Sequence, residues 1–237
     1  MTGVDAGRAG ASVQVVAIDG PAGTGKSTTA REVAGRLRWR YFDSGAFYRA
    51  AALLALRLGL DLAAPADRAR LRTALRDADL EQELVGGASR VWLEGEDVSV
   101  EIRTPVVTAI VSRVADDPEL REVVNVELRQ RVGERPAVID GRDIGTVVFP
   151  DAFLKVFLVA SLEERARRRV AEVEPERAND PAVLASYAQS LAERDRQDEE
   201  RAVGALKPAA DALHIDTSGL DIATQVARVV RAARDRS

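Results

Sequence analysis

The chain has no cysteine among its 237 residues. This absence excludes disulfide bridges, cysteine nucleophiles and metal sites built from thiolates. It also fits a reducing compartment, and we expect a cytoplasmic location. The only histidine is His214, in the apolar stretch Ala-Leu-His-Ile at residues 212–215, where a structural place in a strand is expected. Chemistry that depends on a histidine base is therefore disfavoured.

Long apolar runs are also missing. None approaches the roughly 20 residues that a membrane-spanning helix needs, so no membrane partner is expected. Residues 1–12 are rich in glycine and alanine and lack the apolar stretch of a secretory signal. We interpret them as a disordered tail, although a start codon assigned too far upstream would give the same sequence.

Lysine is scarce, and arginine supplies most of the positive charge. The only lysines are Lys26, Lys155 and Lys207. Guanidinium groups suit bidentate contacts with phosphate, so any phosphate site away from these lysines must rely on arginine. The formal net charge of −4 argues against binding to nucleic acid through bulk charge, and no nucleic-acid partner is expected.

The clearest motif is a phosphate-binding loop. Residues 20–27 read Gly-Pro-Ala-Gly-Thr-Gly-Lys-Ser, which is a complete G-x-x-x-x-G-K-[ST] pattern. An apolar, β-branched run at 13–18 precedes it and predicts a buried strand, and the spacing over 28–37 predicts a helix. Lys26 is expected to contact the β- and γ-phosphates and the Ser27 hydroxyl to bind Mg²⁺. The residues expected to hold the nucleotide phosphates are Gly20, Pro21, Ala22, Gly23, Thr24, Gly25, Lys26, Ser27 and Thr28.

Short apolar runs alternate with helical patterns along the chain. Strands separated by helices predict an α/β fold with a mainly parallel sheet and helices on both faces. The five runs expected to form the sheet lie at 13–18, 39–42, 137–139, 154–159 and 212–215.

The long gap between the second and third runs predicts an insert. Strand-like pieces at 83–85 and 91–93, separated by glycines, favour a small antiparallel sheet. Helices are expected on either side of it, at 46–58, 67–76 and 105–115. Farther along, Ser161 begins a capping box that starts a helix at Leu162, and Asp180-Pro181 begins another helix. The charged connection at about 172–180 is expected to be exposed.

Polar residues follow the second and third predicted strands. Residues 43–49 read Asp-Ser-Gly-Ala-Phe-Tyr-Arg, and residues 140–145 read Asp-Gly-Arg-Asp-Ile-Gly. Ligands bind at the carboxyl ends of strands in open α/β sheets, so both segments are candidates for an acceptor site. Arg49 and Arg142 supply positive charge there. Asp43 and Asp140 are also compatible with the alternative of helix caps or turns.

At these residues the chain resembles the bacterial-type cytidylate kinases, which are P-loop nucleoside monophosphate kinases. The matching segments are IDGPAGTGKST, DSGAFYR, LEGEDVSVEIRTP, DGRDIGTVVFPDA, SLEERARRR, ERDRQDEERAV and PAADAL. The resemblance implies a P-loop kinase core with a five-stranded, mainly parallel sheet, an acceptor-binding insert and a mobile helical lid. It implies one kinase domain over 13–237, with the core at 13–45, 116–160 and 202–237, the acceptor region at about 46–115 and the lid at about 161–201.

The resemblance also implies the reaction and the reading of the base. The family transfers the γ-phosphoryl group of ATP to CMP or dCMP with Mg²⁺, and we expect a monomer. Its cytosine pocket corresponds to Ser112, Arg121 and Asp143. Cytosine presents an amino donor beside two acceptors, which suits a carboxylate beside an arginine. Uracil would instead place a carbonyl against Asp143.

The remaining roles are carried over from the family in the same way. The acceptor phosphate is expected at Arg49 and Arg142, with Ser44 and Tyr48 lining the site and Arg103 as a further candidate. Arg194 and Asp198 are expected at the sugar and Arg201 between the phosphates. Catalytic contacts are expected from Lys26, Arg142, Arg165, Arg169 and Arg201, with Arg168 also on the lid face.

Surface ion pairs are the competing interpretation of these charged helices. Arg194, Asp198 and Arg201 share one helix face at spacings that also suit solvated charge pairs. Glu163 and Glu164 could likewise pair with the lid arginines.

Three other functions are compatible with a phosphate-binding loop. The first is a kinase for another small acceptor, such as UMP, AMP or shikimate. The second is a GTPase-type switch, which needs an N-K-x-D motif that this sequence lacks. The third is a nucleotide-binding module without catalysis, which would not need the acceptor arginines.

Overall fold

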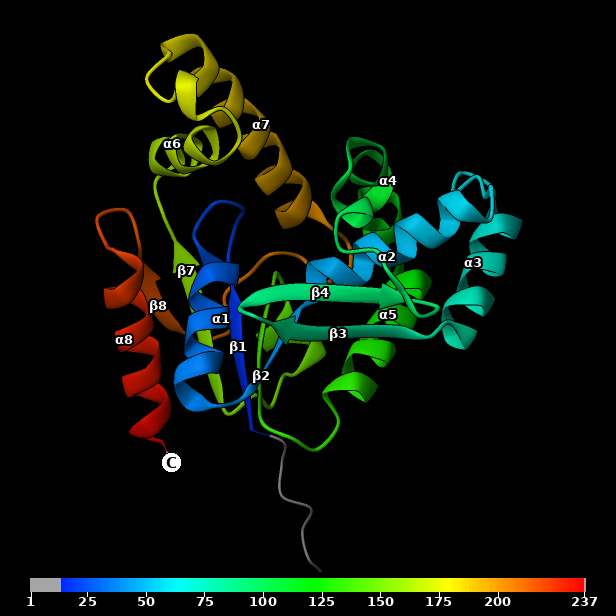
Figure 1. The fold of residues 1–237 in the computed structure, drawn as a ribbon, viewed down its shortest axis with the longest axis horizontal. Helices are drawn as coiled ribbons and strands as arrows, with labels where there is room; N and C mark the ends of the chain where they lie inside the picture. Colours follow the sequence, from blue (N-terminus) through cyan, green and yellow to red (C-terminus); the bar gives the residue numbers. More distant parts are fainter. Residues whose placement is uncertain (1–13, 237) are drawn as a thin grey trace, which may run out of the picture.

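A five-stranded sheet forms the centre of the molecule (Figure 1). The computed structural model describes residues 14–236, so the tail predicted at 1–12 lies outside the described residues. The strand order is β2-β6-β1-β7-β8 and every neighbouring pair is parallel, which confirms the predicted sheet. The strands are β1 (Val15–Asp19), β2 (Arg40–Asp43), β6 (Ala137–Gly141), β7 (Leu154–Val159) and β8 (Leu213–Asp216).

Helices cover both faces of this sheet, as the sequence predicts. Alternate residues of a strand point to opposite faces. In β1, Val16 and Ile18 belong to an apolar cluster shared with α1 (Lys26–Leu37) and α8 (Ile222–Arg234). Val15 and Ala17 belong to a larger cluster on the opposite face, shared with α2 (Ser44–Arg57) and α5 (Pro118–Val132). The central strand is therefore buried on both sides, which fixes the position of the loop that follows it.

The predicted insert is present as a second, antiparallel sheet. It contains β3 (Leu80–Val85), β4 (Ala88–Leu93) and a short third strand, β5 (Glu96–Asp97). It lies in the chain between α3 (Pro65–Asp77) and α4 (Pro105–Asp116), and the short 3₁₀ turn Glu101–Arg103 precedes α4. Both helices begin with proline, which suits the first helical turn because no N–H is needed there.

Two helices project beyond the carboxyl edge of the main sheet (Figure 1). They are α6 (Leu162–Val173) and α7 (Pro181–Glu200), and the exposed turn Pro175–Arg177 lies between them. The Ser161 hydroxyl accepts the Glu164 N–H at 3.2 Å, and the Asp180 carboxylate accepts the Ala182 N–H at 2.9 Å. Both predicted helix starts are confirmed.

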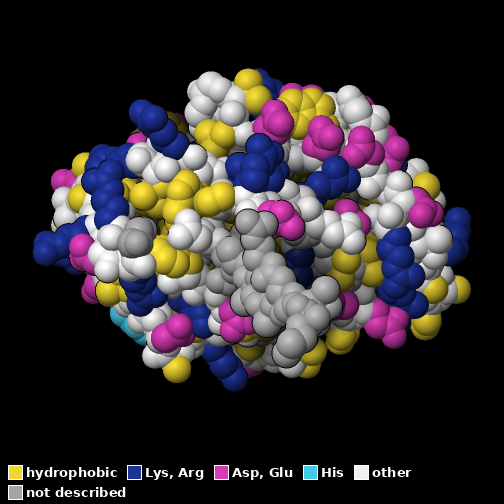
Figure 2. All heavy atoms as spheres, turned by 90° about the horizontal axis from the view of Figure 1, so that it is seen from below, with side chains coloured by type: hydrophobic (Ala, Val, Ile, Leu, Met, Phe, Trp, Pro, Cys, Tyr) yellow, Lys and Arg dark blue, Asp and Glu magenta, His cyan; other side chains and the backbone are white. Residues whose placement is uncertain are grey.

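Two helices, α5 and α8, were not predicted from the sequence. Helix α5 buries Arg121 and Asn125, and these polar residues interrupt its apolar spacing. Helix α8 has regular apolar spacing through Val226, Val229 and Val230, so the sequence pattern could have predicted this helix. Among residues 14–236, no helix has the length and apolar character to cross a membrane. On the face in Figure 2, basic and acidic side chains are interspersed.

Candidate active site

The register of three neighbouring strands brings the sequence motifs together. Asp19 at the end of β1 pairs with Gly141 of β6, and Asp43 at the end of β2 pairs with Asp140. Because these strands are parallel, their carboxyl ends meet at one edge of the sheet. The phosphate loop and both acceptor segments therefore lie side by side.

The phosphate loop has a conformation that requires glycine. At Gly20 the backbone has φ +147°, and an added Cβ would overlap the carbonyl oxygen of Leu158. Lys26, at the start of α1, folds back so that its ammonium donates to the carbonyl of Pro21 at 2.6 Å. Burial lowers its pKa well below the usual value, and Arg142 and Arg194 add to that effect. The Lys26 side chain is thus buried in the loop, where its ammonium has the Pro21 carbonyl as a hydrogen-bond partner.

Ser27 and Asp140 form an oxygen-rich contact beside Lys26. The Ser27 hydroxyl donates to Oδ2 of Asp140 at 2.7 Å, and the Tyr41 hydroxyl donates to Oδ1 at 2.7 Å. Burial raises the pKa of Asp140 to about 6, and Asp43 contributes to the rise. Asp43 does cap a helix, since it accepts the Ala46 N–H. Asp140 caps no helix and was not among the predicted site residues, although its place at the end of a strand beside β1 is where ligands bind in such sheets.

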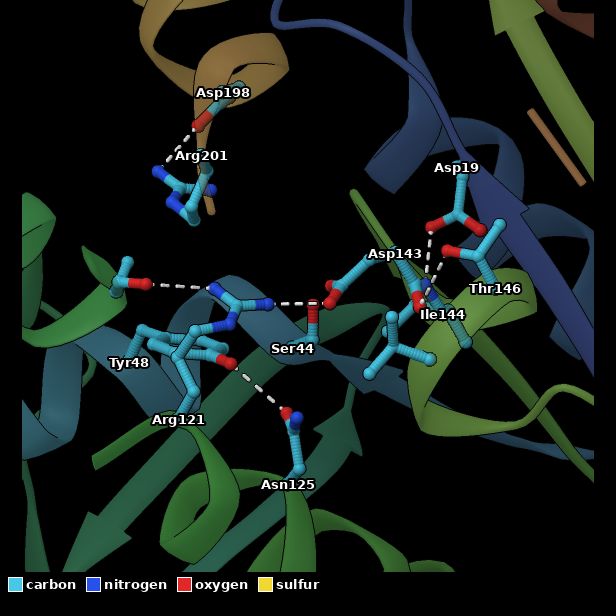
Figure 3. A network of polar contacts seen from close by, with 12 residues as sticks. Asp19, Ser44, Tyr48, Arg121, Asn125, Asp143, Ile144, Thr146, Asp198 and Arg201 are labelled. Atoms are coloured by element: carbon cyan, nitrogen blue, oxygen red, sulfur yellow. Dashed lines mark hydrogen bonds and ion pairs between the residues drawn. The ribbon is translucent and has the colours of Figure 1, made fainter. Parts of the chain in front are cut away.

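Arg121 and Asp143 form a buried ion pair at the centre of the network in Figure 3. Nη2 of Arg121 lies 2.5 Å from Oδ2 of Asp143, and the two side chains are only 3% and 6% exposed. The guanidinium also donates to the carbonyl of Ala115 and lies over the Tyr48 ring, 5.3 Å from its centroid. Burial raises the pKa of Asp143, and Arg121 opposes the rise.

Arg121 retains capacity for a ligand. Within the described part of the chain, its buried Nε has no hydrogen-bond partner. The Tyr48 hydroxyl beneath it donates to Oδ1 of Asn125 at 3.0 Å, a contact that the sequence did not reveal. Ser112, predicted to join this pocket, is half-buried on α4, and over residues 14–236 its side chain has no hydrogen bond to Arg121 or Asp143.

A second ion-pair group lies beside the first. Asp198 on α7 accepts from Nε of Arg142 at 2.8 Å and from Nη2 of Arg201 at 2.9 Å. Burial opposes ionisation of Asp198, but these guanidinium groups outweigh it and its pKa is lowered. Arg201 also reaches Asp116 on α4. Asp198 and Arg201 therefore pair in a buried position, with Arg201 just beyond the end of α7, whereas Arg194 is exposed. The interpretation as a solvated charge face is wrong for Asp198 and Arg201 and remains open for Arg194.

Five cationic side chains from five segments lie close enough to influence the pKa values within the group. Burial lowers the pKa of Arg49, and Arg103, Arg142 and Arg169 add to the effect. Burial also lowers the pKa of Arg194 to about 10, again with Arg142, Arg49 and Arg169 contributing. We call this group the cationic cluster, and its members are Lys26, Arg49, Arg142, Arg169 and Arg194. Cations that disfavour one another's charge make a site suited to a polyanion.

The other residues predicted for the acceptor site make hydrogen bonds or ion pairs with neighbouring residues of the chain. Arg49 donates to the carbonyl of Ile102 and to Thr108, and Arg103 pairs with Asp43 at 3.2 Å. Ser44 donates to the carbonyl of Asp140 at 2.8 Å.

The three arginines of the predicted lid have different partners. Arg165 donates to the carbonyl of Ala22 at 3.2 Å and pairs with Asp195 at 2.5 Å, so it already lies on the phosphate loop. Arg168 pairs with Glu164 and donates to Thr217. Arg169 pairs with Glu172 at the surface. The predicted pairing with Glu164 therefore holds for Arg168 but not for Arg165, and both Arg168 and Glu164 are half-buried.

Comparison with known proteins identifies the family. The sequence model of the family described as cytidylate kinase matches residues 16–235. The chain belongs to the cytidylate kinase family. Proteins named cytidylate kinase from Desulfitobacterium hafniense and Symbiobacterium thermophilum are each 45% identical to it, over 93% of this chain and 93% and 96% of their own lengths. One from Pelotomaculum thermopropionicum is 46% identical over 91% of this chain and 93% of its own length.

Gly204 lies against the buried ion pair of Arg121 and Asp143. It has φ +71° in the segment that links α7 to β8, and an added Cβ would overlap Nη2 of Arg121 and Oδ2 of Asp143. Those atoms have little room to retreat, because both side chains are buried and bonded to each other. A glycine is required here for close approach as well as for backbone conformation.

Alanine at this position is expected to be unusually destabilising. Gly204→Ala should lower the free energy of unfolding by about 2–4 kcal/mol, because left-handed backbone and overpacking both contribute. Gly59→Ala is the matched control: Gly59 has φ +62° with no atom near the added Cβ, and a loss of only about 1 kcal/mol is expected. Urea unfolding of both variants measures the difference, and equal losses would contradict the steric account.

Proposed function

We propose that the protein transfers the γ-phosphoryl group of ATP to the phosphate of CMP or dCMP, giving ADP and CDP or dCDP. The observation that carries this proposal is the meeting of the phosphate loop and the segments at 43–49 and 140–145 at one edge of the sheet, beside the buried Arg121–Asp143 pair and with the cationic cluster around them. A donor triphosphate and an acceptor monophosphate both need such charge. Membership in the cytidylate kinase family supports the same reaction.

On the donor side, residues 20–28 cradle the phosphates and Lys26 neutralises their charge. Ser27 and Asp140 are the residues that would hold Mg²⁺, and their oxygen atoms fit its preference for hard ligands. Among residues 14–236 there is no group of three or more His, Cys, Asp or Glu suited to a metal ion. This fits Mg²⁺, which is commonly held by one or two protein ligands together with phosphates and water. When bound, the ion neutralises charge on the phosphates.

On the acceptor side, Asp143 accepts a hydrogen bond from the cytosine amino group, and Arg121 and Ser112 donate to the ring acceptors. A uracil carbonyl facing the Asp143 carboxylate would leave a buried charge unpaired. Tyr48 lies beneath the Arg121 guanidinium and supports it.

The phosphate and sugar contacts come from the surrounding arginines. Arg49, Arg142 and Arg103 bind the acceptor phosphate, and Ser44 lines that site. Arg194 and Asp198 hold the ribose, and Arg201 reaches between the two phosphates.

Catalysis in this proposal is positioning and charge neutralisation. The acceptor phosphate is ionised near neutral pH, so no general base is required, in keeping with a single histidine that lies on β8. Arg142 and Arg201 stabilise the charge of the loose transition state, and Arg165 and Arg169 approach from the lid. Closure of the lid excludes water and suppresses hydrolysis of ATP. The division into core, acceptor region and lid, the monomeric state and the cytoplasmic location stay predictions.

A coupled assay of ADP release tests the proposal. The protein is incubated with ATP, Mg²⁺ and one acceptor at a time, from CMP, dCMP, UMP, AMP, GMP and shikimate. We expect turnover mainly with CMP and dCMP. Turnover with a different acceptor would keep the kinase chemistry but overturn the base assignments. ADP release that needs no acceptor would indicate an ATPase or a switch and would overturn the kinase proposal.

A further inference from the structure

Asp19 joins the donor loop to the base-reading segment. It is the last residue of β1, directly before Gly20, and is 4% exposed. Its Oδ1 accepts the N–H of Ile144 at 2.9 Å (Figure 3). Its Oδ2 accepts the N–H of Gly145 at 2.8 Å. Both carboxylate oxygens are thus committed to consecutive amides of one turn, and these are the two residues that follow Asp143.

The turn held by Asp19 is not a regular helix start. Asp143 has φ −139° and ψ 25°, outside the usual helical and extended regions, and a short π-helical turn (Ile144–Val148) follows it. Such a backbone persists only where its surroundings determine it. The direction of the Asp143 side chain therefore depends on the position of the amides at 144 and 145.

The anchor itself is rigid. Asp19 lies on a strand that pairs with β6 on one side and β7 on the other, and both faces of that strand are buried. Hydrogen bonds from amides to a carboxylate are roughly twice as strong as neutral ones. Burial raises the pKa of Asp19 to about 6, and the two amide bonds oppose the rise. A buried carboxylate is a costly means of holding a turn, which favours a role in geometry over one in stability alone.

We propose that Asp19 is a positioning residue for the acceptor base: it fixes the turn at residues 144 and 145 and thereby aims the Asp143 carboxylate, together with its partner Arg121, at the cytosine. This inference rests on the proposed function. Asp19 does not touch substrate, since both of its oxygens face the turn, and it acts through Asp143.

The nearly isosteric variant Asp19→Asn tests the role. The new amide group turns an acceptor into a donor that faces a backbone N–H, so the turn shifts. A displacement of about 1 Å in a binding site can cost up to about 100-fold. For this smaller disturbance we expect KM for CMP to rise about tenfold, with KM for ATP changed less than about twofold and the CMP-to-UMP ratio of kcat/KM reduced.

Two comparisons distinguish a positioning role of Asp19 from a general loss of stability. Val229→Ala removes part of a fully buried side chain on α8, far along the chain from the base pocket, and controls for lost stability alone. A double-mutant cycle then tests the route of action. If Asp19 works through Asp143, Asp19→Asn adds little to KM for CMP once Asp143→Asn is present.

The outcomes are distinguishable. A selective rise in KM for CMP that disappears in the Asp143→Asn background supports the proposal. Equal rises in both KM values, or an unchanged KM for CMP, would overturn it. A wild-type protein without activity on CMP would instead refute the proposed function. If Asp19→Asn does not fold, Asp19→Ser retains one acceptor oxygen, and the same selective rise in KM is required of it.

Discussion

Replacing Lys26 by alanine is expected to lower kcat with CMP by roughly 10²- to 10³-fold, because one well-placed donor at a site of developing charge is worth about that much. Lys26 is buried within the phosphate loop and its ammonium has the Pro21 carbonyl as its partner. Its charge is thus available to the triphosphate. The measurement is kcat at saturating ATP and CMP, and residual activity near the wild-type value would refute the assigned role.

The same substitution should not weaken the fold. A lysine whose pKa is lowered on folding destabilises the protein wherever its amine is protonated, because burial disfavours the charged form. Lys26→Ala is therefore expected to leave the free energy of unfolding unchanged or raise it. Lys207→Ala, which removes an exposed lysine, is the control and should keep full activity. Loss of activity together with a clear loss of stability would indicate collapse of the loop rather than a missing charge.

The phosphate loop and the sheet were predictable because local sequence determines them. Gly20, Lys26 and Ser27 stand at the fixed spacing of the motif, and the strand before and the helix after them have clear apolar patterns. The capping residues Ser161 and Asp180 were readable for the same reason, since a cap bonds to amides within its own helix.

Contacts between segments that lie far apart in the sequence were harder to predict. The family resemblance placed Arg121 and Asp143 in one pocket, but their direct ion pair depends on how α5 packs, and α5 was not predicted. Asp19 looked like an ordinary strand end, and only the fold reveals the amides at 144 and 145 that it holds. Gly204 carries no signal of its own in sequence, because its close neighbours are far away in the chain.

Side-chain partners also decided between interpretations that sequence left open. Spacing alone placed Arg165, Arg168 and Arg169 on one face of a helix. In the structure Arg165 reaches the phosphate loop, whereas Arg168 is held by Glu164 and Thr217. Helical spacing limits which residues can act together, but charge partners on other elements determine which of them do.

Replacing Asp143 by asparagine is expected to reduce the CMP-to-UMP ratio of kcat/KM by about 10- to 100-fold, as expected for a base contact worth about 1–3 kcal/mol. The amide can still accept from the cytosine amino group through its oxygen. It can also turn its NH₂ toward the uracil carbonyl, which the carboxylate repels. Selectivity should therefore fall mainly through a gain with UMP, and kinetics with both acceptors at saturating ATP measure it.

Asp117→Asn is the matched control for this change. Asp117 caps α5, the helix that carries Arg121, by accepting the N–H groups of Glu119 and Leu120, and asparagine caps a helix about as well. The control should keep the wild-type ratio. If Asp143→Asn still rejects UMP as strongly as the wild type does, the carboxylate does not read the base. Discrimination would then have to come from the Arg121 side of the pair, whose guanidinium keeps its contacts with Ala115 and the Tyr48 ring without Asp143.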